Sequence, residues 1–396
     1  MHVLVANLGS TSFKYRLFAL DGEQARLLTR GGSERVTDYG AAIDRALQEL
    51  AASGHLSSPD ILDAVGFKTV LGGDLTGCLL ADERVEKALR DTADLAPAHN
   101  PPYAEGLRIF RERLPKVPRV ALFETAFYQW VPESARRYAV PEAWYQAGIR
   151  RYGFHGASHK FVAERSAELL GHDELASLVR RLYLDGPRPL PGKPLRVISC
   201  HLGGSSSATG ILNGVAIGTS MGLSPQSGLP QNNRVGDLDS AALPCAMRRL
   251  GLTQAEAERQ LVKESGLLGL SGKSNDFRDI ETAADQGDAR ARLALDVYVH
   301  SIRQWIGSFW VELGGCDALV FTAGIGENNS WLRTEVCDGL ADLGLVLDPT
   351  RNASAPPETD LAANNSRTRV LVIPANEELV VAREAARLIA SLRPTA

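Results

Sequence analysis

The stretch "HVLVANLGSTSFKYRLFALDGEQARLL", residues 2–28, decides the fold of this chain. It opens with an apolar run typical of a buried strand, passes through a turn of glycine and hydroxyl residues, and continues as a strand of alternating character. The dipeptide Asp21-Gly22 then predicts a hairpin into a third strand. We therefore expect three connected strands with a hydroxyl-rich turn after the first.

The same plan returns in "LRVISCHLGGSSSATGILNGVAIGTSM", residues 195–221, with a hairpin predicted at Asn213-Gly214. Two copies of one supersecondary unit imply two similar domains that face each other across a cleft. Other patterned segments are the helical "YGAAIDRALQELAAS" (39–53) and "HKFVAERSAELLG" (159–171) and the strand "VPRVALFETAF" (117–127). The predicted class is α/β.

Two later segments repeat a strand, a turn and a helix. "DALVFTAGIGENNSWLRTEVCDGLADLG" (317–344) predicts a glycine turn, and "RVLVIPANEELVVAREAARLIASL" (369–392) predicts a polar turn before a long terminal helix. Both turns follow the carboxyl ends of strands, where α/β folds place ligands. "DGPRPLPGKP" (185–194) predicts a surface loop before the second copy.

These segments predict two domains. The first spans residues 1–149 and the second spans residues 150–377, and residues 378–396 form a helix that packs back on the first domain.

Composition excludes several classes of partner. The 396 residues include 44% hydrophobic residues, enough for a large core, and the formal net charge is -4. The basic residues are dispersed, so neither nucleic acid nor a membrane is an expected partner, and no apolar run approaches a membrane span. The five cysteines are odd in number and form no CxxC pair, which indicates reduced, buried thiols and a cytoplasmic location.

The stretch "RRYGFHGASHK", residues 150–160, places His155 and His159 four residues apart. On a helix the pair would share a face, so a zinc hydrolase is one interpretation. However, the intervening "GAS" lacks the carboxylate of HExxH, and no third ligand follows nearby. Gly156 favours a strand-to-helix turn with His155 at its mouth. A capping or core role and a catalytic role for His155 both stay open at this point.

Three glycine-rich strand ends suit phosphate groups. In "NLGSTSFK", Gly9 allows close backbone approach, while Ser12 and Lys14 offer donors to phosphate oxygens. "HLGGSSSATG" and "TAGIGEN" add two further such ends, although an ordinary hairpin turn explains any one of them. Neither GxxxxGK[ST] nor GxGxxG is present. Together the three ends predict a nucleotide with several phosphates.

Nine stretches in order carry a resemblance that covers almost the whole chain: "NLGSTSFK", "LAPAHNPP", "RYGFHGASHKFV", "HLGGSSSATG", "TSMGLSPQSGLP", "RVGDLD", "GLSGKSNDFRDIE", "FTAGIGEN" and "IPANEEL". By these the sequence resembles the acetate kinases, members of the acetate and sugar kinase, Hsp70 and actin superfamily. The resemblance implies duplicated ribonuclease H-like, actin-like ATPase domains around a central ATP cleft. It also implies a homodimer.

The resemblance also implies roles for individual residues. His155 would contact the phosphoryl group in transit, without zinc, and Arg234 would hold the substrate and that group, since a guanidinium fork suits oxyanions. Asn7 and Glu377 would bind Mg²⁺ or Mn²⁺, which takes one or two carboxylates plus phosphates and water. The nucleotide would contact Ser12, Lys14, His201, Gly203, Gly204, Asp276, Phe277, Arg278, Gly324, Gly326 and Asn328. Purely structural roles are the alternatives: Arg234 would lie at the surface and pair with Asp237, and the segment around Phe277 would be a helix cap with a packed phenylalanine.

The sequence departs from the family pattern at three site positions. This chain has "FKTVLGG" (67–73) where the family usually has "HRVVHGG". Lys68 therefore replaces an arginine, which keeps the positive charge but loses the bidentate geometry of a guanidinium group. "FETAFY" stands for "FDTAFH", so Glu124 replaces an aspartate, and Gly204 replaces an asparagine. Lys68 and Glu124 complete the expected catalytic set with His155 and Arg234.

The acid would lie in a small apolar pocket formed by Val70, Ala98, Phe154 and Pro225, next to Lys68 and Arg234. Ala98 stands where the family commonly has leucine, which leaves room for a longer acid unless a neighbour such as Leu71 fills the space. The expected activity is reversible, ATP-dependent phosphorylation of acetate or propionate to the acyl phosphate and ADP. A catalytically weakened nucleotide-binding protein that acts on a partner through domain closure is the alternative.

Overall fold

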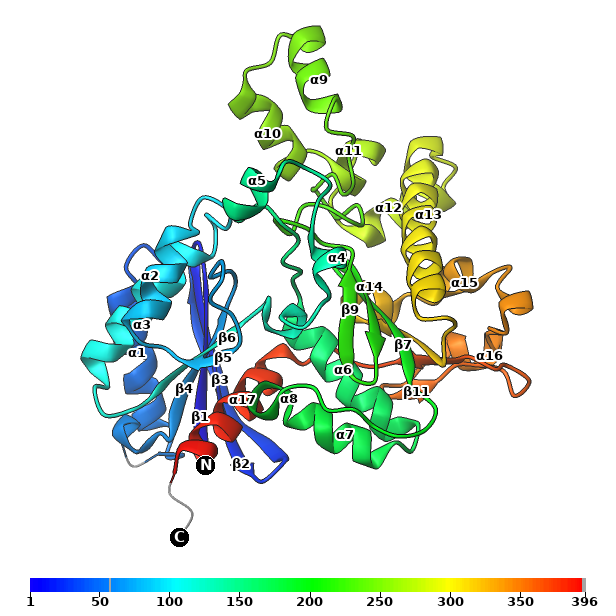
Figure 1. Ribbon diagram of the computed structural model, residues 1–396. Coiled ribbons are helices and arrows are strands. Elements are labelled where there is room, and N and C mark those ends of the chain that lie inside the picture. Colours follow the sequence, from blue (N-terminus) through cyan, green and yellow to red (C-terminus); the bar gives the residue numbers. More distant parts are fainter. Residues whose placement is uncertain (57, 394–396) are drawn as a thin grey trace.

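The protein is described here from a computed structural model of residues 1–56 and 58–393 (Figure 1). The described residues form two six-stranded mixed sheets, each covered by helices. No helix among them combines the length and the apolar character that crossing a bilayer requires. The α/β class expected from the sequence is confirmed.

The first sheet has the strand order β3-β2-β1-β4-β6-β5. Its strands are β1 (His2–Gly9), β2 (Ser12–Asp21), β3 (Gln24–Glu34), β4 (Ala64–Thr69), β5 (Cys78–Leu80) and β6 (Arg119–Phe123). Strands β1, β4 and β6 run parallel, and the other pairings are antiparallel. The central strand β4 is almost entirely buried, as its apolar residues on both faces require.

The second sheet repeats the first, with the order β9-β8-β7-β10-β12-β11. Its strands are β7 (Arg196–Leu202), β8 (Ser206–Leu212), β9 (Val215–Thr219), β10 (Ala318–Thr322), β11 (Thr359–Asp360) and β12 (Arg369–Val372). Strands β7, β10 and β12 are parallel, in the positions of β1, β4 and β6. The expected duplication is confirmed, and both predicted hairpins connect the strands that the sequence indicates.

Helices connect and cover the strands (Figure 1). Between β3 and β7 lie α1 (Tyr39–Ala52), η1 (Pro59–Ile61), α2 (Glu83–Asp91), α3 (Asn100–Arg113), η2 (Ala126–Tyr128), α4 (Glu133–Arg136), α5 (Glu142–Gln146), α6 (Gly156–Leu169), α7 (Asp173–Arg180) and α8 (Leu182–Asp185). After β9 come α9 (Ala242–Leu250), α10 (Gln254–Lys263), α11 (Gly266–Ser271), α12 (Phe277–Asp285), α13 (Ala289–Glu312), α14 (Ala323–Asn328), α15 (Ser330–Cys337), η3 (Ala341–Leu343), α16 (Pro349–Ala353) and α17 (Glu377–Leu392). Helices α9 and α10 project from the rest of the molecule (Figure 1).

Two expectations need correction. The segment predicted as a glycine turn after β10 is the helix α14, which begins directly at Ala323, so Gly324 and Gly326 lie in a helix rather than in a loop. Cys245 is only half-buried, whereas the other cysteines are buried, and all five thiols are unpaired. The predicted loop before the second copy is confirmed, because residues 186–195 lie between α8 and β7.

Helices α6 and α17 pack against each other, and α6 contacts β6 of the first sheet as well as β7 and β10 of the second. Helix α17 follows β12 in sequence but packs on β4 and β1. The domain boundary at residues 149 and 150 remains a prediction, since α6 contacts both sheets.

An ion network lies between these two helices. Lys160 of α6 donates to Glu164 at 3.2 Å and to Glu384 of α17 at 2.5 Å, with all three side chains 3% exposed or less. Arg387 of α17 binds Glu384 at 2.6 Å. A buried charge without its partner is expensive, so the network fixes the register of one helix against the other.

We expect Lys160→Met to lower the free energy of unfolding by about 2 kcal/mol, because Glu164 and Glu384 lose their shared ammonium and keep only arginine partners such as Arg387. The double variant Lys160→Met/Glu384→Gln should recover most of that loss. Arg113→Ala, which removes an exposed pair with Asp44 at 2.6 Å, is the control and should cost under about 1 kcal/mol. Urea denaturation measures the free energy of unfolding of all three variants. Equal losses of stability for Lys160→Met and Arg113→Ala would contradict the stabilising role assigned to the buried network.

Candidate active site

A cavity of about 220 Å³ lies where both halves of the chain meet. Asn7 lies two residues before the end of β1, Lys68 is the last residue but one of β4, Glu124 follows β6 and His155 precedes α6. The cavity is lined by Asn7, Leu8, Gly9, Lys68, Val70, His99, Tyr103, Glu124, Phe154, His155, Ser205, Pro225 and Arg234. Because β1, β4 and β6 are parallel, their carboxyl ends converge at one edge of the sheet.

The start of α6 is pressed against the end of β6. The amide of Gly156 donates to the backbone oxygen of Glu124 at 2.9 Å, and a Cβ at residue 156 would overlap that oxygen. His155 adopts a left-handed conformation, with φ of 60°, directly before α6. The predicted strand-to-helix turn is wrong, because the element before α6 is the helix α5 and residues 147–155 form no strand. Its side chain makes no capping hydrogen bond to the described residues, so the capping interpretation is wrong.

Lys68 binds two carboxylates from distant parts of the chain. Its Nζ lies 3.0 Å from Glu124 Oε1 and 2.6 Å from Glu377 Oε2. Burial alone would lower the pKa of Lys68, but the two carboxylates outweigh it and hold that pKa well above its usual value. Burial raises the pKa of Glu124, whereas the nearby ammonium keeps the pKa of Glu377 lowered despite burial.

A chain of hydrogen bonds runs behind His155. Ser199 Oγ lies 2.8 Å from His159 Nδ1, and Ser207 Oγ lies 2.8 Å from both His159 Nε2 and His155 Nδ1. Both nitrogens of His159 are thus occupied by hydroxyls, which leaves neither for a metal. When Ser207 donates to His155 Nδ1, the proton of His155 sits on Nε2, the nitrogen that remains for a ligand oxygen.

His201, at the end of β7, stacks on His155 with ring centroids 4.1 Å apart, and its Nδ1 lies 2.8 Å from Ser158 Oγ. Burial lowers the pKa of His201 to about 4. Burial, with His201 close by, also holds the pKa values of His155 and His159 well below the usual range. At neutral pH these rings are therefore neutral hydrogen-bonding groups.

Arg234 lines the cavity from the second half of the chain, and its Nη1 donates to Gln231 Oε1 at 3.2 Å. Burial lowers its pKa from the ordinary value. The alternative of a pair with Asp237 is wrong, because Asp237 accepts from the backbone amide of Gly228 at 2.9 Å. The guanidinium is therefore free to bind an anion in the cavity.

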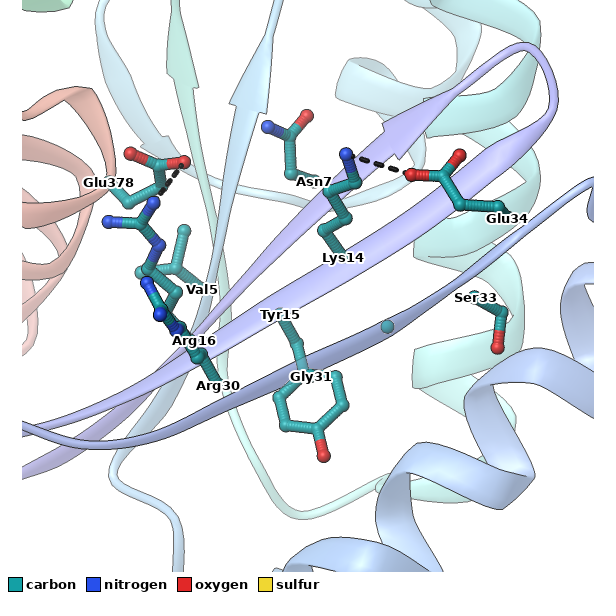
Figure 2. A pocket seen from close by; sticks show the side chains of 11 residues that line it. Val5, Asn7, Lys14, Tyr15, Arg16, Arg30, Gly31, Ser33, Glu34 and Glu378 are labelled. Carbon is teal, nitrogen blue, oxygen red and sulfur yellow. Dashed lines mark ion pairs between the residues drawn. The ribbon is translucent and has the colours of Figure 1, made fainter.

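A second cavity of about 390 Å³ lies on the face of β1, β2 and β3 (Figure 2). Asn7 lines both cavities, and Lys14 extends toward Glu34 at 2.9 Å. Figure 2 also shows Arg16 turned toward Glu378 of α17. Lys14 is thus brought beside Asn7, as the first glycine turn predicted, whereas Ser12 is not among the described lining residues of either cavity.

The predicted nucleotide residues of the second half lie outside these cavities. Asp276 caps α12 by accepting from the Arg278 amide at 2.9 Å, and Phe277 is buried against Tyr298. The helix-cap interpretation is therefore confirmed. Asn328 donates to the backbone oxygen of Gly324 at 2.8 Å within α14.

The turn after β7 contains Gly203 and Gly204. The amide nitrogen of Asn232 lies 3.3 Å from the point that a Cβ at Gly204 would occupy. The side-chain amide that the chain lacks at position 204 is therefore present at Asn232. Sequence reasoning missed this residue, because a close approach between two turns leaves no local pattern.

Ala98 is exposed, and the described lining of the substrate cavity does not include it. Its neighbour His99 lines the wall instead, together with Val70, Phe154 and Pro225. Sequence reasoning also missed Tyr103, a fully buried side chain whose hydroxyl donates to Asn7 Oδ1 at 2.8 Å. The signal available was the position of Tyr103 directly after "HNPP", one helical turn beyond His99.

Comparisons with known proteins agree with this geometry. The chain is 40% identical over 410 residues to the acetate kinase of Geobacillus kaustophilus, with 98% of each covered. The crystal structure of Porphyromonas gingivalis acetate kinase matches with a TM-score of 0.87 at 32% identity, covering 98% of this chain and 99% of that one. A propionate kinase from Francisella tularensis matches with a TM-score of 0.82 at 31% identity, covering 97% and 98%.

The fold and the site together define a phosphotransferase built on duplicated actin-like ATPase domains. Residues 29–383 match the acetokinase family. The chain belongs to that family, which confirms the resemblance seen in the sequence.

The buried histidines predict a loss of stability in mild acid. The pKa values of His99, His155, His159 and His201 are lowered, so the unfolded chain binds protons below pH 6.5 that the native protein does not. Glu124, whose pKa is raised, offsets at most one of these four protons. The free energy of unfolding should therefore fall between pH 6.5 and 5, by up to about 4 kcal/mol per pH unit.

Urea denaturation at pH 7.5, 6.0 and 5.0 measures this slope. His159→Gln should reduce it by about a quarter to a third, depending on how far Glu124 offsets the histidines, whereas His300→Gln, at an exposed position, is the control and should reduce it far less. A flat profile over this range would contradict neutral histidines in the native protein.

Proposed function

We propose that the protein catalyses reversible transfer of the γ-phosphoryl group of ATP to the carboxylate of acetate or propionate. The observation that carries this proposal is the convergence of Lys68, His155 and Arg234 on one small cavity. A cavity of about 220 Å³ suits a short acid, and its cationic and hydrogen-bonding groups suit two reacting anions.

The chemistry needs positioning more than it needs a base, because the acid is already ionised at neutral pH. A carboxylate oxygen attacks the γ-phosphorus in line with the bond to ADP, which breaks as the acyl phosphate forms. Arg234 binds the acid and the moving phosphoryl group through its planar fork. His155 donates from Nε2 to a phosphoryl oxygen, held in that tautomer by Ser207, and so stabilises charge that grows in the transition state.

The residues present suit a divalent cation. Within the described part of the chain, Glu124 Oε2 and Glu377 Oε1 are buried and have no hydrogen-bond partner. No cluster of three or more His, Cys, Asp or Glu side chains suited to a metal occurs there, as expected for Mg²⁺, which takes phosphate oxygens and water as further ligands. Glu377, Glu124 and Asn7 would hold the ion, which would neutralise phosphate charge.

We place the nucleotide along the second sheet, beside the turn at Gly203 and Gly204 that follows β7 and beside helix α14, which begins directly after β10 and packs on β7. A contact of the adenosine with the start of α12 stays a prediction of the sequence. Asn232 supplies an amide donor beside the turn. Homodimer formation and a cytoplasmic location stay predictions of the sequence.

Arg234→Ala and His155→Ala should each lower turnover by about a hundredfold or more, because both side chains stabilise developing charge rather than pack the core. Acyl phosphate is trapped as the hydroxamate in a reaction with ATP, Mg²⁺ and each of formate, acetate, propionate and butyrate. Circular dichroism confirms that the variants are folded. If wild-type protein forms no acyl phosphate from any of these acids, the proposed kinase activity is wrong and the weakened nucleotide-binding protein becomes the better interpretation.

The acid preference should respond to Val70 and not to Ala98. Val70→Ala shortens a side chain of the wall and so enlarges the cavity. The extra methylene of propionate can then be buried there, which contributes roughly 0.8 kcal/mol, so the kcat/KM of propionate relative to acetate should rise a few-fold. Ala98→Leu, at an exposed position outside the described lining, is the control and should leave that ratio unchanged. If Ala98→Leu lowers the kcat/KM of propionate more than that of acetate, Ala98 does line the acid pocket and this prediction is wrong.

A further inference from the structure

The ammonium of Lys68 occupies the space between the two carboxylates that suit a metal. Its Nζ contacts one oxygen of Glu124 at 3.0 Å and one oxygen of Glu377 at 2.6 Å. The other oxygen of each carboxylate is buried and has no partner among the described residues. The side chains of Lys68, Glu124 and Glu377 are 21%, 6% and 20% exposed, so water screens their charges poorly.

One positive charge against two negative charges leaves the group with a net charge of -1 and two unused acceptor oxygens. A divalent cation would neutralise both carboxylates and use these oxygens. Lys68 and the cation carry like charges and require the same two carboxylates. Their simultaneous binding is therefore unfavourable.

We propose that Lys68 is a tethered counter-ion that competes with the divalent cation for Glu124 and Glu377, and that its ammonium turns to the acid substrate when the cation enters. This inference rests on the proposed function for the identity of the acid. The side chain has the reach for both positions, because Lys68 lines the acid cavity together with Val70 and Arg234. A lysine suits this exchange, since its ammonium is a point charge on a flexible stem, unlike the rigid fork of arginine.

The exchange couples the two ligands. In the metal-free protein the ammonium is bound to the two carboxylates and does not contact the acid. After the cation enters, the released ammonium adds a positive charge next to Arg234 in the acid cavity. Because coupling between two sites is reciprocal, the acid should also tighten binding of the cation.

Binding of Mn²⁺ alone tests the competition, measured by electron paramagnetic resonance of the free ion. Lys68→Met removes the competing ammonium and should tighten Mn²⁺ binding by roughly tenfold or more. Lys14→Met is the matched control, because it removes the same charge beside Asn7 but breaks only an exposed pair with Glu34 at 2.9 Å. Mn²⁺ affinity that is unchanged or weaker in Lys68→Met, or equally tightened in Lys14→Met, would overturn the proposal.

Saturation-transfer NMR of propionate tests the coupling. In wild-type protein Mg²⁺ should tighten propionate binding several-fold, and in Lys68→Met this effect should be lost. Equal effects of Mg²⁺ on the two proteins would overturn the exchange. The hydroxamate assay on wild-type protein tests the kinase activity separately from the role of Lys68. If wild-type protein forms acyl phosphate but the Mn²⁺ and propionate responses are absent, the kinase activity stands and the role proposed for Lys68 is wrong.

Wild-type protein provides a measurement that does not depend on the variant being folded. An amine-reactive label quantified by mass spectrometry should modify Lys68 faster with Mg²⁺ than without it, since release from the two carboxylates exposes the amine to the reagent. Lys14 should label at the same rate in both conditions. A Lys68 rate that Mg²⁺ leaves unchanged would count against the exchange.

Discussion

The contact of Lys68 with Glu124 and Glu377 is the constraint on which the site depends. It joins the ends of β4 and β6 to the start of α17, across 309 residues of sequence. Both carboxylates are largely withdrawn from water, so each requires a nearby cation, and the chain supplies one ammonium for the two. The three segments are thereby held at one point, and one oxygen of each carboxylate stays buried without a hydrogen-bond partner among the described residues.

A second set of buried charges, the ion network between α6 and α17, stabilises the helices that begin at the site. Lys160, Glu164 and Glu384 fix the packing of α6 on α17. Helix α6 begins directly after His155, which lines the cavity, and α17 begins at Glu377, which binds Lys68. A shift of one residue along either helix would move its end by about 1.5 Å. That displacement is large compared with the tolerance of a hydrogen bond, so the buried network and the geometry of phosphoryl transfer are linked.

The departures from the family pattern are physically connected. Lys68 replaces an arginine and so puts a compact ammonium in place of a planar guanidinium. Glu124 replaces an aspartate and is longer by one methylene, and the two side chains meet at 3.0 Å. Gly204 lacks an amide that Asn232 brings to the same place. Each departure thus has a polar or charged neighbour in the structure, Glu124 beside Lys68 and Asn232 beside Gly204.

The sequence by itself determined the duplicated strands, their hairpins, and the position of His155 directly before a helix, because periodicity and turn chemistry act over a few residues. It also identified most of the groups that line the acid cavity. Only the tertiary structure decided that Glu377 meets Lys68, that Ser207 bridges two histidines, and that His99 rather than Ala98 forms the wall. These contacts join residues far apart in the chain or depend on side-chain direction, and packing rather than local pattern selects them.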